Sequence, residues 1–115
     1  MPTYAYEFND NNAPEVFAPT LEGPPVATHA SEEQYLFDLP NVPFPALLTA
    51  GQQALAASMR TAWANFATNG NPASATMPWP AYGSGSARML SLVPPQPQVE
   101  TDFAARHHCA FWAAG

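Results

Sequence analysis

The sequence contains no lysine and only three arginines, whereas nine residues are acidic, so the formal net charge of the 115 residues is −6. A nucleic-acid binder needs a cationic surface that releases counterions from phosphates. An anionic membrane surface would likewise repel this acidic chain. Neither nucleic acid nor a membrane surface is therefore expected as a partner.

Cysteine and long apolar runs are also scarce. Cys109 is the only cysteine, so an internal disulfide is impossible. No apolar run approaches the roughly 18–20 residues that span a bilayer. Residues 1–4 have neither the basic start nor the apolar stretch of a signal peptide. The sequence thus predicts no membrane insertion and leaves the localisation open.

Proline, by contrast, is abundant, with 14 residues in the chain. Proline fixes its own φ and pushes the residue before it toward extended conformations, so long continuous elements are disfavoured. Apolar residues make up 47% of the chain, which suffices for one core but not for two domains of this length. We expect one segment, residues 1–115, of short helices and one or two strands joined by long loops.

The N-terminal part predicts a strand and a short helix. Residues 3–8 carry aromatic side chains at every second position, which is typical of a strand. A turn over residues 9–12 and a loop over 13–28 should follow, because Asx residues favour turns and four prolines interrupt any helical period. Ser31 and Gln34 then match a capping box that begins a short helix, which Pro40 and Pro43 end.

The most strongly predicted helix covers residues 50–68, between a second capping box (Thr49 and Gln52) and a stop signal at Gly70. It carries one apolar stripe, formed by Leu55, Met59, Ala62, Trp63 and Phe66. Since one strand cannot form a sheet, we expect this stripe to stay partly open to solvent in the chain alone.

The C-terminal part predicts a short strand over residues 88–93, an extended linker over 94–97 and a helix over about 101–112. That helix would align Phe103, His107 and Phe111. Adjacent His107, His108 and Cys109 do not have the spacing of zinc ligands, so neither a metal nor another cofactor is predicted.

His29 is the candidate catalytic residue, because it lies in a loop between the first strand and a helix, where catalytic side chains collect in α/β folds. Four blocks support this interpretation: residues 27–37 around His29, residues 63–72, residues 79–82 and residues 107–112. Together they resemble, in order and approximate spacing, the C-terminal portion of type B carboxylesterases, which are α/β-hydrolases. The resemblance implies a C-terminal segment of that fold, mostly helices and loops.

The resemblance further implies hydrolysis of carboxylic esters by a Ser–acid–His triad, with His29 as the general base. No G-x-S-x-G elbow for the nucleophile and no Gly-Gly tract for an oxyanion hole occur in the chain. We therefore expect the chain alone to be inactive, and expect its partners to be the upstream part of the same fold and, when complete, a small ester substrate.

Several alternatives remain open. Glu32 is either a buried carboxylate that helps to hold the histidine loop, as the family pattern implies, or a first-turn glutamate that favours the helix dipole. The apolar stripe of the long helix covers either the hydrolase core or a second subunit, as in cholinesterase-like relatives. The chain as a whole could also be a non-catalytic binding module that keeps the fold, as in neuroligin-like relatives.

Overall fold

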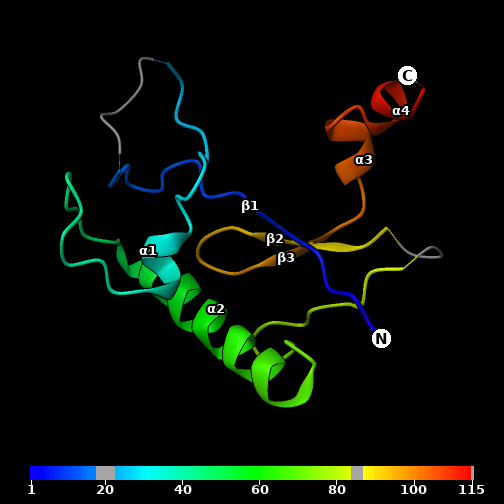
Figure 1. The fold of residues 1–115 in the computed structure, drawn as a ribbon, viewed down its shortest axis with the longest axis horizontal. Helices are drawn as coiled ribbons and strands as arrows, with labels where there is room; N and C mark the ends of the chain where they lie inside the picture. The colour runs from blue at the N-terminus through cyan, green and yellow to red at the C-terminus, as the bar shows by residue number, and fades with distance from the viewer. Residues whose placement is uncertain (18–22, 84–86, 115) are drawn as a thin grey trace.

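The computed structural model describes residues 1–17, 23–83 and 87–114. Along the chain, the described residues form two strand-containing regions separated by a long helix (Figure 1). The elements are β1 (Tyr6–Phe8), α1 (Glu33–Leu36), α2 (Ala50–Asn69), β2 (Met89–Leu92), β3 (Gln98–Glu100), α3 (Phe103–Arg106) and α4 (Cys109–Ala113).

The three strands form one sheet in the order β1-β2-β3. β1 pairs with β2 in parallel, whereas β2 pairs with β3 in antiparallel. All four residues of β2 are buried, as expected of a central strand. β3 is one strand more than the sequence predicted, because bends at residues 94–96 return the chain along β2 instead of extending it as a linker.

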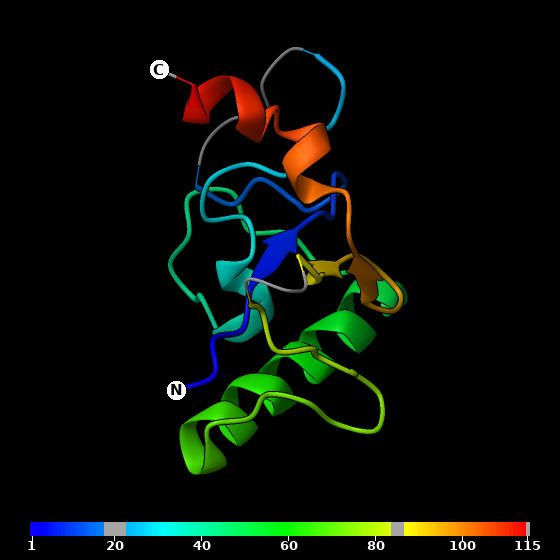
Figure 2. The same cartoon turned by 90° about the vertical axis from the view of Figure 1, so that its right-hand side faces the viewer.

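The sheet separates two layers of different character. In Figure 2, α2 (green) lies below the strands, and α3 and α4 (orange and red) lie above them. Side chains alternate between the faces of a strand, so Tyr6 contacts Trp63 of α2 and Phe8 contacts Tyr35 of α1. Glu7 points to the other face, where it binds Arg106 of α3. The lower layer is therefore apolar and the upper layer is held by charges.

α2 forms as predicted, because its ends are defined by local chemistry. The Thr49 hydroxyl accepts from the Gln52 amide (3.3 Å) and the Gln52 side chain accepts from the Thr49 amide (2.8 Å), which completes the capping box. Gly70 ends the helix with φ +77°, a left-handed conformation that suits glycine.

The apolar stripe of α2 is buried at one end and open at the other. Leu55, Met59 and Ala62 are fully buried in the core with Leu90 and Leu92 of the sheet, so the expectation of an open stripe is wrong for this half. Toward the C-terminal end of α2, Trp63 is half-buried and Phe66 remains 50% exposed. Here Trp63 lies edge-on to Tyr6 at 5.3 Å.

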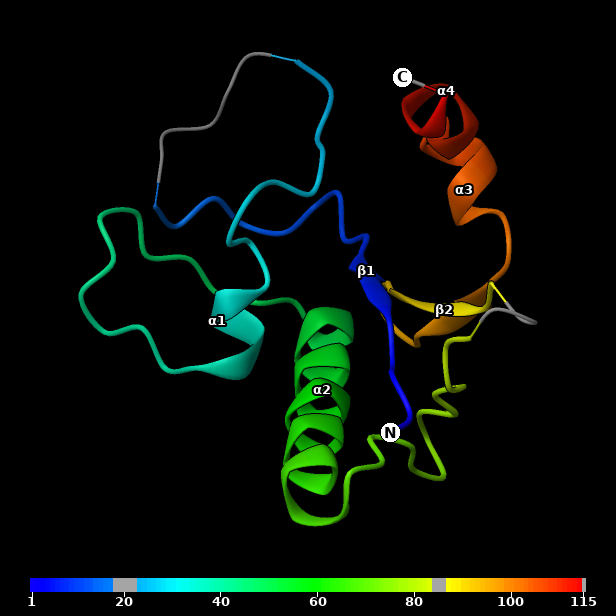
Figure 3. The same cartoon turned by 45° about the vertical axis from the view of Figure 1, so that its right-hand side comes forward.

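α1 is short, as predicted, but its capping box does not form. Helical residues begin at Glu33, and no side chain caps the helix. The Ser31 hydroxyl instead donates to the Thr28 carbonyl (2.8 Å), and the Gln34 side-chain Nε2 donates to the Pro14 carbonyl (2.6 Å) and to the Ser31 carbonyl (3.2 Å). A local carbonyl has therefore taken the Ser31 hydroxyl, and the Gln34 side chain binds carbonyls instead of the Ser31 amide. Figure 3 shows α1 beside the upper end of α2.

The predicted C-terminal helix is broken in two, which corrects the continuous helix over residues 101–112. His108 has φ +51°, a left-handed conformation that an α-helix cannot contain, and it separates α3 from α4. Phe103 and His107 stack at 4.2 Å as the helical spacing predicted. Phe111 is no longer aligned with them and is 72% exposed.

Candidate active site

His29 lies at the tip of the turn that leads into α1, and its side chain is exposed. The Ser31 amide donates to the Thr28 carbonyl (3.2 Å) and the Glu33 amide donates to the Ala30 carbonyl (3.1 Å), so the backbone folds tightly around the histidine. Ala30 has φ +66°. A left-handed conformation costs a residue with a Cβ roughly 1–2 kcal/mol, so surrounding contacts must hold this turn.

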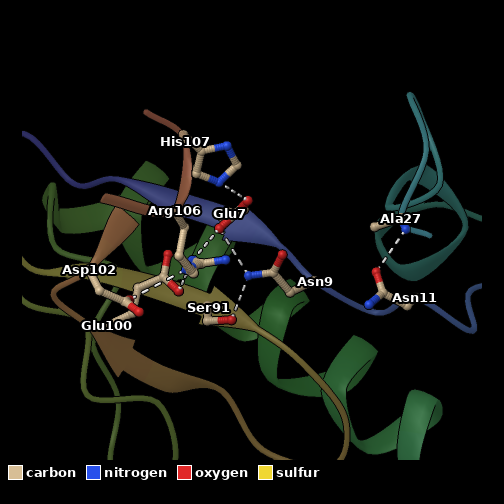
Figure 4. A network of polar contacts seen from close by, with 9 residues as sticks. All are labelled: Glu7, Asn9, Asn11, Ala27, Ser91, Glu100, Asp102, Arg106 and His107. Carbon is tan, nitrogen blue, oxygen red and sulfur yellow. Dashed lines mark hydrogen bonds and ion pairs between the residues drawn. The ribbon is translucent and has the colours of Figure 1, made fainter. Parts of the chain in front are cut away.

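Those contacts come from the loop that follows β1. The Asn11 side chain accepts from the Ala27 amide (3.0 Å), a bond drawn in Figure 4. The Glu15 carboxylate accepts from the Thr28 hydroxyl. The two residues before His29 are therefore both bonded to side chains that are distant in the sequence.

Behind the histidine loop lies a buried polar cluster centred on Asp10, which is only 3% exposed. The Tyr35 hydroxyl donates to its carboxylate, and so does the Gln52 side chain (2.8 Å). Burial and the neighbouring carboxylate hold the pKa of Tyr35 well above its ordinary value, so the phenol keeps its proton and remains a donor. This cluster joins the end of β1 to α1 and α2.

Glu32 precedes α1 as its N-cap residue and is half-buried, but its side chain makes no capping hydrogen bond. Burial raises the pKa of Tyr6, and the negative charge of Glu32 raises it further. Both interpretations of Glu32, as a carboxylate that holds the loop and as a first-turn glutamate, therefore remain predictions.

The acidic residues that precede His29 are engaged elsewhere where the structure describes them. Glu7 binds Arg106 (2.8 Å), Asp10 binds Tyr35, and Glu15 binds Thr28. Glu22 lies outside the described residues. Within residues 1–17 and 23–28, then, each acidic side chain has a partner other than the imidazole.

A charged network on the upper face of the sheet was missed from the sequence (Figure 4). The Arg106 guanidinium donates to both Glu7 (2.8 Å) and Glu100 (2.6 Å), and His107 lies 2.7 Å from Glu7. The spacing of Asp102 and Arg106, four residues apart on a helix, was the one local signal for part of it.

The two carboxylates of this network respond differently to their surroundings. Burial raises the pKa of Glu7, but hydrogen bonds from Asn9 and Arg106 outweigh it and hold the pKa below its ordinary value. Burial raises the pKa of Glu100, and the attraction of Arg106 does not offset it. The neighbouring carboxylates of Glu7 and Asp102 raise the pKa of Glu100 further.

The C-terminal histidines and Cys109 do not converge. His107 turns toward Glu7, His108 is exposed in the break between the helices, and Cys109 is a free, half-buried thiol. The described part of the chain contains no group of three or more His, Cys, Asp or Glu side chains arranged to hold a metal ion. Nor does any described helix combine the length and the apolar character that crossing a membrane requires.

The fold is that of a segment of an α/β-hydrolase-like esterase, and solved structures share it. A structure of PNB esterase superimposes with a TM-score of 0.66 at 24% identity, over 94% of this chain and 21% of that chain. The carboxylesterase EST55 of Geobacillus stearothermophilus at pH 6.2 gives a TM-score of 0.66 at 27% identity, over 95% and 22%. The chain thus spans about one fifth of the length of these relatives.

The family follows from the sequence itself. The model of the carboxylesterase family matches residues 1–112, and the chain belongs to that family. This agrees with the resemblance to type B carboxylesterases seen in the four sequence blocks.

Proposed function

We propose that this chain is the histidine-bearing C-terminal part of a carboxylic ester hydrolase, and that His29 is its general base. The observation that carries the proposal is the setting of His29: an exposed imidazole on a tight turn, braced by the loop after β1, in a member of the carboxylesterase family. An imidazole that takes up and releases protons near neutral pH suits this task.

In the proposed reaction, His29 accepts the proton of a serine hydroxyl as the oxygen attacks the ester carbonyl. It then donates a proton to the leaving alcohol, while an acidic side chain holds the other ring nitrogen in the correct tautomer. The serine, that acid and the oxyanion hole belong, in this proposal, to a portion of the fold upstream of residue 1. The substrate is a small carboxylic ester.

The outer edge of β1 is the proposed contact with that portion. The Leu90 amide donates to the Ala5 carbonyl (3.1 Å), and the Asn9 amide donates to the Leu92 carbonyl (2.9 Å). Alternate residues from Ala5 to Asn9, on either side of β1 and within it, therefore turn their backbone polar groups toward β2. The amides and carbonyls of Tyr6 and Phe8 therefore point to the other edge, where no strand of the described residues pairs with them. A parallel strand of the upstream portion would satisfy them.

The test is His29→Ala in the complete enzyme, with His108→Ala as the matched control because His108 is also exposed. Loss of the general base should lower kcat by about 10²–10⁴-fold, whereas His108→Ala should leave kcat unchanged. Full turnover by the His29→Ala enzyme would show that another residue is the base. No turnover of ester by the parent enzyme would instead show that the fold is a non-catalytic module.

Glu32 is proposed to help hold the histidine loop once the fold is complete. Glu32→Gln should then lower kcat, whereas Glu33→Gln, an exposed neighbour, should not. If Glu32 acts only on the helix dipole, both substitutions would shift the melting temperature slightly and leave kcat alone.

A further inference from the structure

The turn directly after β1, residues 9–12, is fixed by its own hydrogen bonds. The Asn11 amide donates to the Asn9 carbonyl (3.1 Å), and the Asn12 amide donates to the Asp10 carboxylate (3.0 Å). Asn9 also donates to Ser91 of β2 (2.8 Å), which joins the start of the turn to the sheet. The turn is thus a rigid extension of the sheet.

This turn holds the histidine loop on both sides of His29. On one side, the Asn11 side chain accepts from the amide of Ala27, two residues before the histidine. On the other side, the Asp10 carboxylate accepts from the hydroxyl of Tyr35, six residues after it. Two neighbouring side chains of one turn therefore hold the segment before His29 and the segment after it.

The bond between Asp10 and Tyr35 has little freedom to shift. Asp10, Tyr35 and Gln52 are 3%, 0% and 4% exposed, so water does not compete for these groups. Gln52 of α2 donates to the same carboxylate oxygen as Tyr35. The Tyr35 ring also packs edge-on against Phe8 of β1 at 5.0 Å.

A displacement of Tyr35 would also displace the backbone next to His29. The Tyr35 amide donates to the Glu32 carbonyl (3.0 Å), and the Glu33 amide donates to the Ala30 carbonyl (3.1 Å), so hydrogen-bonded turns connect Ala30, the residue after His29, to Tyr35. α1 has only four helical residues and no side-chain cap. A helix this short is not stable by itself, so its direction depends on the contacts at Tyr35.

We infer that Asp10 and Asn11, with Tyr35 as the donor to Asp10, are positioning residues that set the location of the His29 imidazole. The inference rests on the proposed role of His29 as the general base. Catalysis is sensitive to such positioning, because a misplacement of about 1 Å can cost roughly 100-fold in rate.

The experiment uses the complete enzyme and measures kcat and KM separately, with each rate normalised to the folded fraction from circular dichroism. Asn11→Ala removes the acceptor for Ala27, and Tyr35→Phe removes the donor to Asp10. Each should lower kcat by roughly 10- to 100-fold with KM unchanged. Asn11→Asp keeps an acceptor oxygen for the Ala27 amide and should restore most of kcat.

Two controls separate positioning from general loss of stability. Tyr4→Phe makes the same chemical change as Tyr35→Phe in a half-buried tyrosine whose hydroxyl lies outside this cluster, and it should not alter kcat. Gly70→Ala strains the far end of α2 and should lower the melting temperature without lowering kcat. If Tyr35→Phe does not fold, the comparison of Asn11→Ala with Asn11→Asp tests the positioning role alone. Asn11 is exposed, so substitutions there leave the core intact.

The inference is overturned if Asn11→Ala keeps the kcat of the parent enzyme, or if Asn11→Asp is as slow as Asn11→Ala. A different result would overturn the proposed function itself, namely an unchanged kcat in His29→Ala. The two failures are therefore distinguishable, since the second concerns the imidazole and the first only the residues that hold its loop.

Discussion

The Gln52 side chain makes hydrogen bonds at two places in the fold. Its removal should therefore lower the free energy of unfolding more than the removal of most polar side chains does. Its Oε1 accepts from the Thr49 amide (2.8 Å) and so completes the N-terminal cap of α2. Its Nε2 donates to the Asp10 carboxylate (2.8 Å) and to the Asn12 carbonyl (3.0 Å). Gln52 is 4% exposed, so water cannot replace these bonds after a substitution.

The expected magnitude follows from these bonds. Loss of a helix cap costs about 0.5–2 kcal/mol, and loss of a hydrogen bond to a buried charged group costs about 1.5–3 kcal/mol. Gln52→Ala should therefore lower the free energy of unfolding by about 2–5 kcal/mol. Gln53→Ala is the matched control, because Gln53 is exposed on the same helical turn and its side chain makes one hydrogen bond, to the Leu48 carbonyl.

Urea unfolding followed by tryptophan fluorescence measures both changes, since Trp63 and Trp79 lie in or beside the core. Gln53→Ala should cost no more than about 1 kcal/mol. Equal losses for the two substitutions would refute the reasoning, because they would mean that the buried bonds of Gln52 contribute no more than an exposed one.

Three further outcomes are expected. Gly70→Ala should destabilise the chain by about 1 kcal/mol in the same unfolding assay, because a Cβ there meets nothing within 4 Å and only the backbone at φ +77° is strained. Because the pKa of Glu7 in the folded chain is below its ordinary value of 4.5, its ion pair with Arg106 stabilises the fold above that pH. This contribution is lost as the pH falls through the lowered pKa, so amide exchange in α3 should rise there, and should not in Glu7→Gln. Finally, the 115-residue chain alone should hydrolyse p-nitrophenyl esters no faster than free imidazole; saturable turnover that disappears in His29→Ala would contradict this.

Two similar sequence patterns had opposite outcomes, and the comparison shows what a local motif can predict. Thr49 with Gln52 and Ser31 with Gln34 both match a capping box, yet only the first forms one. α2 is long, so its cap stabilises a helix that its own residues already favour. α1 is a single turn, and the Gln34 side chain donates to the Pro14 and Ser31 carbonyls instead of accepting from the Ser31 amide.

The C-terminal part also shows that a local sequence pattern does not predict contacts with distant residues. A helical period over residues 101–112 was correct for Phe103 and His107, which stack as expected. It failed beyond them, because Arg106 and His107 bind Glu7, a residue that is about 100 positions away in the sequence. No local pattern contains that contact. β3 was missed for a related reason, since its three residues become a strand only by pairing with β2.

The sequence by itself determined those features whose causes lie within a few residues: the bounds of α2 and the strand character of β1. The role of His29 stays a prediction. Only the tertiary structure decided what surrounds the histidine. The bonds that brace its loop join Asn11 to Ala27, Asp10 to Tyr35 and Asp10 to Gln52, across 16, 25 and 42 positions. Such contacts depend on how β1, α1 and α2 pack, because a buried carboxylate takes whichever donors the packing brings to it.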